Sequence, residues 1–539
     1  MSSPYPERPR VLAIGLDAAD ATLVLCWAEE GRLPTLQGLI RAGSTAHLRS
    51  IADRFPDPVW PTITTGCLPG KHGHYNFRCV RPGSYEMVFS PDRSYRRPFW
   101  WLLRRKGVAP GDGYRVLLVD VPKTAPLGDD AVTEVIGWGE RAALRHRSWP
   151  PGLFDEIVAR YGRYPRWLDD DIVRRSVRGE RRYLRTLQRM VDTRTGLLRD
   201  LLRERPWDFC LACFPDMHNA GHVFFRYTRP GTWAYNERHA AQAGDALLRI
   251  YRQVDQSIGE LIAAAPSGTD VVIFAGQGFR LNTNGLRLLP RLLTALGYHV
   301  PRQASVLSGV LNAARGFIPW SIRRHVNACL SLETRTRIMT RMWVEGTDWS
   351  RTRAVAEAEF GQTWVRVNLR GREPEGTVEP GAEYDALCEE IAGELSSLTN
   401  AETGAPAVSE VTRVDTIVEG PHAHEFPDLL VRWSLDELVA AVRHPRLGVF
   451  NENLMDISTS EHSGKAFLIA AGPHIRPGAT VEGGHIIDIA PTLLYLMRAP
   501  IPDDMDGEVL RDIIDPSELA SRPVRREAIE WADNPWGDG

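Results

Sequence analysis

Short apolar runs without polar alternation recur along the chain. They lie at residues 10–16, 114–121, 207–214 and 270–275. Runs of this kind are typical of strands that are covered on both faces of a parallel sheet. Between them lie stretches with the apolar spacing of helices, the longest at residues 180–205. The alternation predicts an α/β fold, with a mixed, mainly parallel sheet sandwiched by helices.

The region from residue 301 to residue 350 differs in character from the rest of the chain. It is rich in Arg, Trp and helix-forming residues, which predicts a helical insertion or lid. An amphipathic membrane-surface helix is the alternative, but a packed lid is favoured because the basic charge is not sustained. We expect a single α/β domain over residues 1–300 and 351–515, and a peripheral polar tail at 516–539.

Composition narrows the classes of function. The chain has 539 residues, of which 43% are hydrophobic, and this is ample for a large core. Its net charge of -3 gives no basic field for binding nucleic acid. The seven cysteines are odd in number, so they favour a reducing compartment over a disulfide framework.

The sequence has neither a signal-peptide pattern nor an apolar run of the roughly 18 residues that a membrane helix needs. We therefore expect a cytoplasmic protein with no nucleic-acid or membrane partner. The oligomeric state stays open.

Residues that could bind a ligand or a metal ion lie where the predicted strands end. Asp17 follows the first strand, and ligands gather at the carboxyl ends of strands in open α/β sheets, although capping the next helix is the simpler role. Asp216, His218 and His222 follow the strand at 207–214. The two histidines are four residues apart, so a helix would place both rings on one side. Imidazoles beside a carboxylate suit a zinc-like ion, whereas a polar capping loop is the alternative.

Residues 58–73 form the most distinctive stretch of the chain, Pro-Val-Trp-Pro-Thr-Ile-Thr-Thr-Gly-Cys-Leu-Pro-Gly-Lys-His-Gly. A helix is predicted over residues 60–65, ended by Gly66 and a Pro-Gly turn. Helix N-termini bind anions, so the hydroxyls of Thr62 and Thr64 face a phosphate or sulfate if they do not merely cap and pack.

Together, several segments in this order resemble the alkaline phosphatase superfamily, in its type I phosphodiesterase/nucleotide pyrophosphatase branch. The resembling segments are residues 15–17, 60–73, 368–376 (Asn-Leu-Arg-Gly-Arg-Glu-Pro-Glu-Gly), 461–464 (Glu-His-Ser-Gly), 488–494 and 502–507. The resemblance implies one large α/β domain. It also implies a centre with two metal ions, usually zinc, and a Thr or Ser nucleophile that cleaves phosphate or sulfate esters.

Three family ligands carry over onto this sequence. Asp17 matches the first metal carboxylate, His222 the histidine of an Asp-x-x-x-His element, and His462 the final histidine ligand. The aspartate of that element falls on His218, with Asp216 two residues earlier as a substitute.

The departures from the family pattern fall on one half of the centre. The family's Asp-His pair falls on Gly276 and Gln277, and its nucleophile falls on Pro56. We therefore expect one transition-metal ion, most simply zinc or else manganese, held by His218, His222 and His462, with Asp216 or Asp17 as the candidate for a further ligand. Water activated by that ion would attack directly, without a covalent intermediate.

Other candidates keep a simpler structural alternative. Thr62, Thr64 and Asp57 are the substitute nucleophiles or bases, although helix start and capping explain each of them as well. The candidates for contact with an anionic small-molecule substrate are Lys71, His72 and Gln277.

Three functions stay open. The first is a metal-dependent hydrolase of phosphodiesters, phosphomonoesters or sulfate esters. The second is a relative repurposed for a non-hydrolytic or group-transfer step in small-molecule biosynthesis, because the nucleophile is missing and a fold does not fix its function. The third is a catalytically inactive binding protein. The first is favoured, because a histidine cluster is hard to explain in an inactive protein.

Overall fold

The computed structural model describes residues 8–89, 95–104, 113–139, 147–165, 176–283, 285, 287–302, 330, 332–359, 362–452 and 458–529. The chain divides into two compact units. The first comprises Met1–His72, Ser94–Leu281 and Ser458–Gly539, and the second comprises Gly73–Arg93 and Asn282–Ile457. Each unit has its own sheets and its own core, and each is described by itself.

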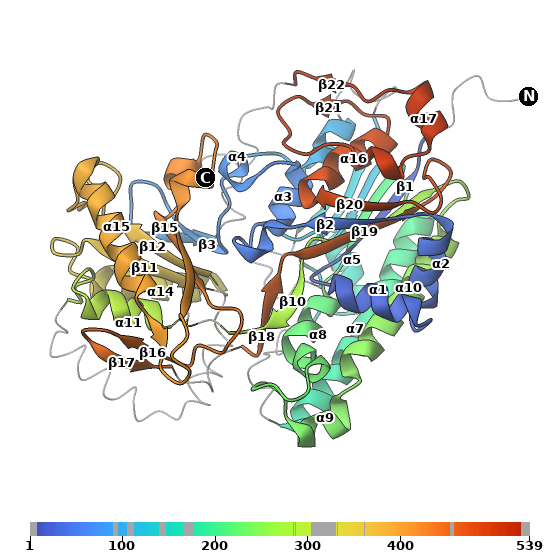
Figure 1. Ribbon diagram of the computed structural model, residues 1–539. Coiled ribbons are helices and arrows are strands. Elements are labelled where there is room, and N and C mark those ends of the chain that lie inside the picture. Colours follow the sequence, from blue (N-terminus) through green and yellow to red (C-terminus); the bar gives the residue numbers. More distant parts are fainter. Residues whose placement is uncertain are drawn as a thin grey trace, which may run out of the picture. The chain divides into compact units, whose positions relative to one another are not determined.

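A nine-stranded sheet forms the centre of the first unit (Figure 1). Its strand order is β20-β2-β19-β9-β1-β8-β5-β6-β7. The bounds are β1 Val11–Leu16, β2 Ser44–Arg49, β5 Val116–Val119, β6 Val132–Ile136, β7 Arg147–Trp149, β8 Phe209–Phe214, β9 Asp270–Ala275, β19 Lys465–Ala471 and β20 Thr480–His485.

Most neighbouring strands of this sheet run parallel. Strand β1 is parallel to both β8 and β9, β5 is parallel to both β6 and β8, and β2 is parallel to β20. Strand β19 runs antiparallel to β2 and β9, and β7 runs antiparallel to β6. The predicted mixed, mainly parallel sheet is therefore confirmed.

Helices cover both faces of this sheet. One face packs against α1 Ala21–Glu29, α2 Pro34–Ala42, α7 Val177–Glu204, α8 Asp216–Phe224 and α10 Ala246–Ala264, and the other against α3 Val59–Thr65 and α16 Ile489–Leu496. Strand β1 explains the apolar run, since Leu12 and Ile14 enter the first core whereas Val11 and Ala13 enter the second. Alternate side chains of a strand point to opposite faces, so burial on both faces requires apolar residues throughout.

Smaller elements complete the first unit. They are α4 Pro69–His72, α5 Leu153–Tyr161, α9 Glu237–Ala243, α17 Pro516–Ser521, the antiparallel pair β10 Gly278–Leu281 and β18 Ser460–Ser463, and the parallel pair β21 Ile501–Pro502 and β22 Arg526–Glu527. Helix α17 buries none of its residues, and it lies in the predicted tail.

The second unit is built on antiparallel sheets. Its four-stranded sheet has the order β11 Ala354–Glu359, β12 Gln362–Val367, β15 Leu429–Trp433 and β14 Val408–Arg413. A three-stranded sheet follows the order β13 Thr399–Asn400, β16 Ala441–His444 and β17 Gly448–Asn451, and β3 Arg78–Val80 pairs with β4 Met87–Phe89. Among the described residues of this unit, the α-helices are α11 Leu288–Ala295, α14 Leu332–Gly346 and α15 Ala382–Ser396.

This unit extends on both sides of the predicted insertion at 301–350. Residues 303–329 and 331 of that segment are outside the described residues, and α14 is its main described part. The lid and the predicted domain limits stay predictions. Within the described residues, no helix is long and apolar enough to cross a membrane.

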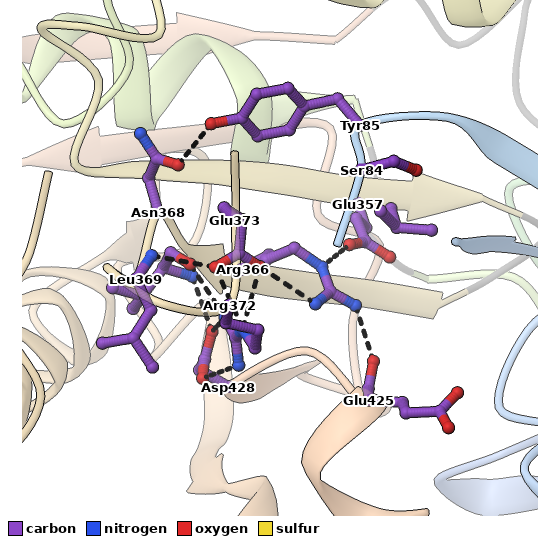
Figure 2. A network of polar contacts seen from close by, with 12 residues as sticks. Ser84, Tyr85, Glu357, Arg366, Asn368, Leu369, Arg372, Glu373, Glu425 and Asp428 are labelled. Carbon is purple, nitrogen blue, oxygen red and sulfur yellow. Dashed lines mark hydrogen bonds and ion pairs between the residues drawn. The ribbon is translucent and has the colours of Figure 1, made fainter. Parts of the chain in front are cut away.

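A buried network of ion pairs fixes the segment at 368–376 that contributed to the family resemblance (Figure 2). Arg366 pairs with Glu357, and Arg372 donates to Asp428 at 2.7 and 2.8 Å and to Glu373 at 2.8 Å. Glu373 also accepts from the backbone N–H of residue 369 at 3.0 Å. Each charge of the network has an opposite partner, as buried charges need. The segment is therefore explained by its role in the fold of the second unit.

Candidate metal centre

Two elements of the first unit bring three histidines together. Helix α8 starts directly after β8 and carries His218 and His222 one turn apart. Strand β18 pairs with β10, the strand that follows β9, and this pairing places His462 opposite Phe279. The three side chains therefore meet beside the carboxyl ends of β8 and β9.

The geometry of this histidine cluster fits a metal ion. One ring nitrogen from each of His218, His222 and His462 lies within 4.8 Å of the others. The Nε2 atoms of His218 and His222 are 2.9 Å apart, and the ring of His462 lies 4.8 and 5.2 Å from theirs, measured between centroids. Three imidazoles on one centre are a donor set that suits zinc and its transition-metal neighbours.

The charge state of His462 is compatible with binding a metal ion. Burial, and next the positive charge of His218, lower the pKa of His462 to about 3. Its imidazole is therefore neutral at physiological pH. A neutral ring offers a nitrogen lone pair to a cation, and a protonated ring does not.

Asp17 lies behind His218 instead of within the cluster. Its Oδ2 is 2.7 Å from Nδ1 of His218, and its Oδ1 accepts from Nε1 of Trp60 at 2.9 Å. Burial acts to raise the pKa of Asp17, but the charge and hydrogen bond of His218 and the hydrogen bond of Trp60 outweigh it, and the pKa is lowered. A carboxylate accepts, so it favours the proton of His218 on Nδ1 and leaves Nε2 for a metal ion.

Asp216 belongs to a different arrangement. Arg194 donates to Asp216 Oδ2 at 3.0 Å and also forms an ion pair with Asp120, and all three side chains are fully buried. Burial raises the pKa of Asp216 despite the charge of Arg194. Asp216 thus fastens the start of α8 to α7 and to the end of β5, whereas the cluster itself consists of the three histidines.

Apolar side chains of α3 occupy the space beside residue 276. A Cβ atom on Gly276 would lie 2.5 Å from Cγ1 of Val59 and 2.6 Å from Cδ1 of Ile63. A Cβ atom on Gly15 would lie 2.4 Å from the Trp60 ring. These distances are too short for a side chain, so this half of the site has no room for a carboxylate at residue 276.

The predicted hydroxyl and base candidates are used inside the fold. The Oγ1 of Thr62 is 3.0 Å from Nε2 of His72, and both residues are fully buried. The Oγ1 of Thr64 donates to the carbonyl of Pro61 at 3.4 Å. Asp57 forms an ion pair with Lys123. None of these contacts is a helix cap, because α3 has Pro58 at its N-cap and no side-chain capping hydrogen bond. The catalytic roles of the three residues stay predictions.

The two remaining candidates for substrate contact differ in their surroundings. Lys71 pairs with Asp506 and donates to the carbonyl of Asp504 at 2.9 Å, so it fastens α4 to the loop at 502–507. Gln277 is buried, and within the described residues its Oε1 accepts no hydrogen bond. Neither observation tests the predicted role of these two residues in substrate binding.

Sequence reasoning missed the residues that orient the cluster. Phe279 lies against all three histidine rings, with centroid distances of 6.1, 5.1 and 5.1 Å to His218, His222 and His462. A Cβ atom on Gly221 would lie 2.0 Å from the Phe279 ring, so a glycine is needed there. The glycine between the two histidines was the one available sign of this close approach.

Comparison with known proteins identifies the family of this chain and proteins that share its fold. A profile of the family described as type I phosphodiesterase/nucleotide pyrophosphatase matches residues 11–431. A segment of 39 residues is 54% identical to the 2,3-bisphosphoglycerate-independent phosphoglycerate mutase of Laribacter hongkongensis (strain HLHK9). That match covers 7% of this chain and only 8% of the length of the mutase.

Two solved structures are similar over most of the chain. The phosphonoacetate hydrolase of Sinorhizobium meliloti 1021, in complex with phosphonoformate, has a TM-score of 0.50 at 13% identity and covers 91% of this chain and 96% of that chain. The murine ectonucleotide pyrophosphatase/phosphodiesterase 5 has a TM-score of 0.48 at 12% identity, covering 94% of this chain and 100% of that chain. At this identity, the likeness to the hydrolase concerns the fold alone.

Proposed function

This chain belongs to the type I phosphodiesterase/nucleotide pyrophosphatase family, and we propose that it is a metal-dependent hydrolase of phosphate or sulfate esters. The proposal places one metal ion on His218, His222 and His462. The observation that carries it is the convergence of these three ring nitrogens within 4.8 Å. Zinc is the favoured ion, and manganese is the alternative.

The residues around the cluster have defined tasks in this proposal. A divalent ion supplies positive charge, which lowers the pKa of water and offsets charge on a phosphoryl or sulfuryl oxygen. Asp17 holds the His218 ring, and α8 and β18 hold the other two rings in place. Pro56 has no hydroxyl at the position of the family's nucleophile, so water attacks the ester directly.

The substrate in this proposal is a small anionic ester in the cytoplasm. The family supports the anionic ester, and the odd number of scattered cysteines supports a reducing compartment. Subcellular fractionation checks the compartment, and recovery of the protein outside the cytoplasm contradicts it.

Metal analysis tests the centre. Protein purified without chelator is expected to carry one ion per chain, and the double variant His222→Ala/His462→Ala is expected to carry none. The matched control is His47→Ala/His424→Ala, which removes two histidines outside the cluster. Absence of metal from the unaltered protein, or unchanged binding in the cluster variant, contradicts the proposal.

A panel of chromogenic phosphate and sulfate esters, with added zinc or manganese, tests the reaction. Hydrolysis that depends on the metal and is lost in the cluster variant is the expected result. Bound metal without hydrolysis of any ester favours the group-transfer alternative, which the missing nucleophile motivates. Absence of both favours a binding protein.

A further inference from the structure

We infer that Trp60 is a positioning residue of the metal centre, which holds Asp17 with an indole N–H and closes the space where a second ion would lie. The inference rests on the proposed one-metal function. It concerns why the centre would hold one ion instead of the two that the family pattern implies. It also concerns which residues orient the ring of His218.

The first step concerns the partners of Asp17. A buried carboxylate needs hydrogen-bond donors or a cation for each oxygen. Here Oδ1 accepts from Trp60 Nε1 at 2.9 Å and Oδ2 lies 2.7 Å from His218 Nδ1. Both oxygens therefore have a partner from the chain itself, and Asp17 needs no ion to remain charged.

The second step concerns the space beside Asp17. The Trp60 ring lies directly on the backbone of Gly15, two residues before Asp17, and 5.8 Å from the ring of Phe274 in β9. Val59 and Ile63, from the same helix, lie against Gly276. The residues of α3 thus fill the region between the ends of β1 and β9, and the indole N–H is the polar group that they present to Asp17.

The third step links Trp60 to metal binding. Asp17 fixes the tautomer and the ring direction of His218, and Trp60 fixes the other oxygen of Asp17. Partners of a metal ligand typically change metal affinity about 10- to 100-fold when they are removed. Because Trp60 acts through Asp17, its loss is expected to matter only while Asp17 is a carboxylate.

A double-mutant cycle tests this chain of contacts. Zinc affinity is measured by competition with a chromogenic chelator for the unaltered protein, Trp60→Phe, Asp17→Asn and the combined variant. We expect a loss of roughly 10-fold for Trp60→Phe and of up to about 100-fold for Asp17→Asn. The combined variant is expected to match Asp17→Asn, since residues that act in one network are not additive.

A matched control separates this role from a general effect on stability. Trp207 is also buried, and its Nε1 donates to the carbonyl of Leu202 at 3.0 Å, outside the cluster. Trp207→Phe is expected to leave zinc affinity unchanged. The absorption spectrum of the cobalt-loaded protein gives a second readout, since a rotated His218 alters it in Trp60→Phe and not in Trp207→Phe.

The outcomes distinguish the inference from the proposed function. If the unaltered protein binds one zinc ion but Trp60→Phe binds it equally well, or its effect adds fully to that of Asp17→Asn, the role of Trp60 is wrong and the one-metal centre stands. Two ions per chain, falling to one in Asp17→Asn, overturn the inference by placing Asp17 on a second ion. Absence of zinc binding by the unaltered protein overturns both.

Discussion

The resemblance of the sequence to its family implies that Gly276 and Pro56 stand where the family pattern has a metal-binding carboxylate and an attacking hydroxyl. Neither side chain can bind a metal ion or donate a proton. Trp60, by contrast, brings an N–H group to Asp17. Single residues in α3 and near the strand ends therefore account for the difference between the two-metal centre of the family pattern and the one-metal centre proposed for this chain.

Restoring the family's residue pair is expected not to restore a second ion. In the variant Gly276→Asp/Gln277→His, the new Cβ meets Val59 and Ile63 at about 2.5 Å, so the packing must shift. Overpacking of this kind costs typically about 1–3 kcal/mol of unfolding free energy. Metal content and urea unfolding measure the two effects. Gly38→Asp is the control, because a Cβ there meets nothing within 4 Å. A rise to two bound metal ions per chain in the Gly276→Asp/Gln277→His variant contradicts the prediction.

At the scale of elements, the geometry of the histidine cluster depends on where α8 is held. Arg194 from α7 joins Asp216 at the start of α8 to Asp120 after β5. The side chains of these three residues, the buried triad, are fully buried. The arrangement holds two carboxylates on one guanidinium. Loss of Arg194 leaves both carboxylates buried without a cation, which is more costly than loss of a surface ion pair.

We expect Arg194→Met to lower the unfolding free energy by about 3–5 kcal/mol and to weaken zinc binding, because α8 carries two of the three histidines. Urea unfolding and chelator competition measure the two changes. Arg249→Met is the matched control, since Arg249 forms an exposed pair with Asp245 one turn away, and such pairs contribute at most about 1 kcal/mol. Equal effects of the two substitutions contradict a special role for the buried triad.

At the scale of the whole molecule, the amino end of β9 carries a contact whose contribution to stability is expected to depend on pH. His474 Nδ1 is 2.7 Å from Asp270 Oδ2, and the backbone N–H of His474 donates to Asp270 Oδ1 at 3.1 Å. The hydrogen bond to Asp270 raises the pKa of His474, although burial acts in the opposite direction. A raised pKa in the folded state stabilises the protein below the ordinary histidine pKa of about 6.5 and loses this effect as the pH rises through the folded value.

The variant His474→Gln keeps a donor for Asp270 but carries no charge. Its deficit in unfolding free energy is expected to be largest near pH 5.5, at about 1 kcal/mol because the pair is partly exposed, and to shrink towards pH 8.5. Urea unfolding at both pH values, in the presence of chelator so that the histidine cluster holds no ion, measures it. A deficit that is independent of pH contradicts the charge of His474 as its cause.

The fold was predictable from the sequence because its signals are local. A strand covered on both faces must be apolar throughout, and β9 was predicted with the observed bounds at residues 270–275. The spacing of His218 and His222 indicates that a helix would place both rings on one side, and α8 provides that helix. The family pattern added the order of the segments and the expectation that His462 joins these two rings.

Tertiary structure decided how these parts are used. Only packing shows that Asp216 pairs with Arg194, that Asp17 lies behind His218, and that α3 leaves no room at Gly276. The physical reason is that periodicity reports which face of an element is buried, whereas the choice of partner depends on side chains from segments far apart in the chain. The sequence by itself thus determined the sheet, its helices and the histidine pair, and the packing of α3, α8 and β18 determined which side chains meet at the candidate centre.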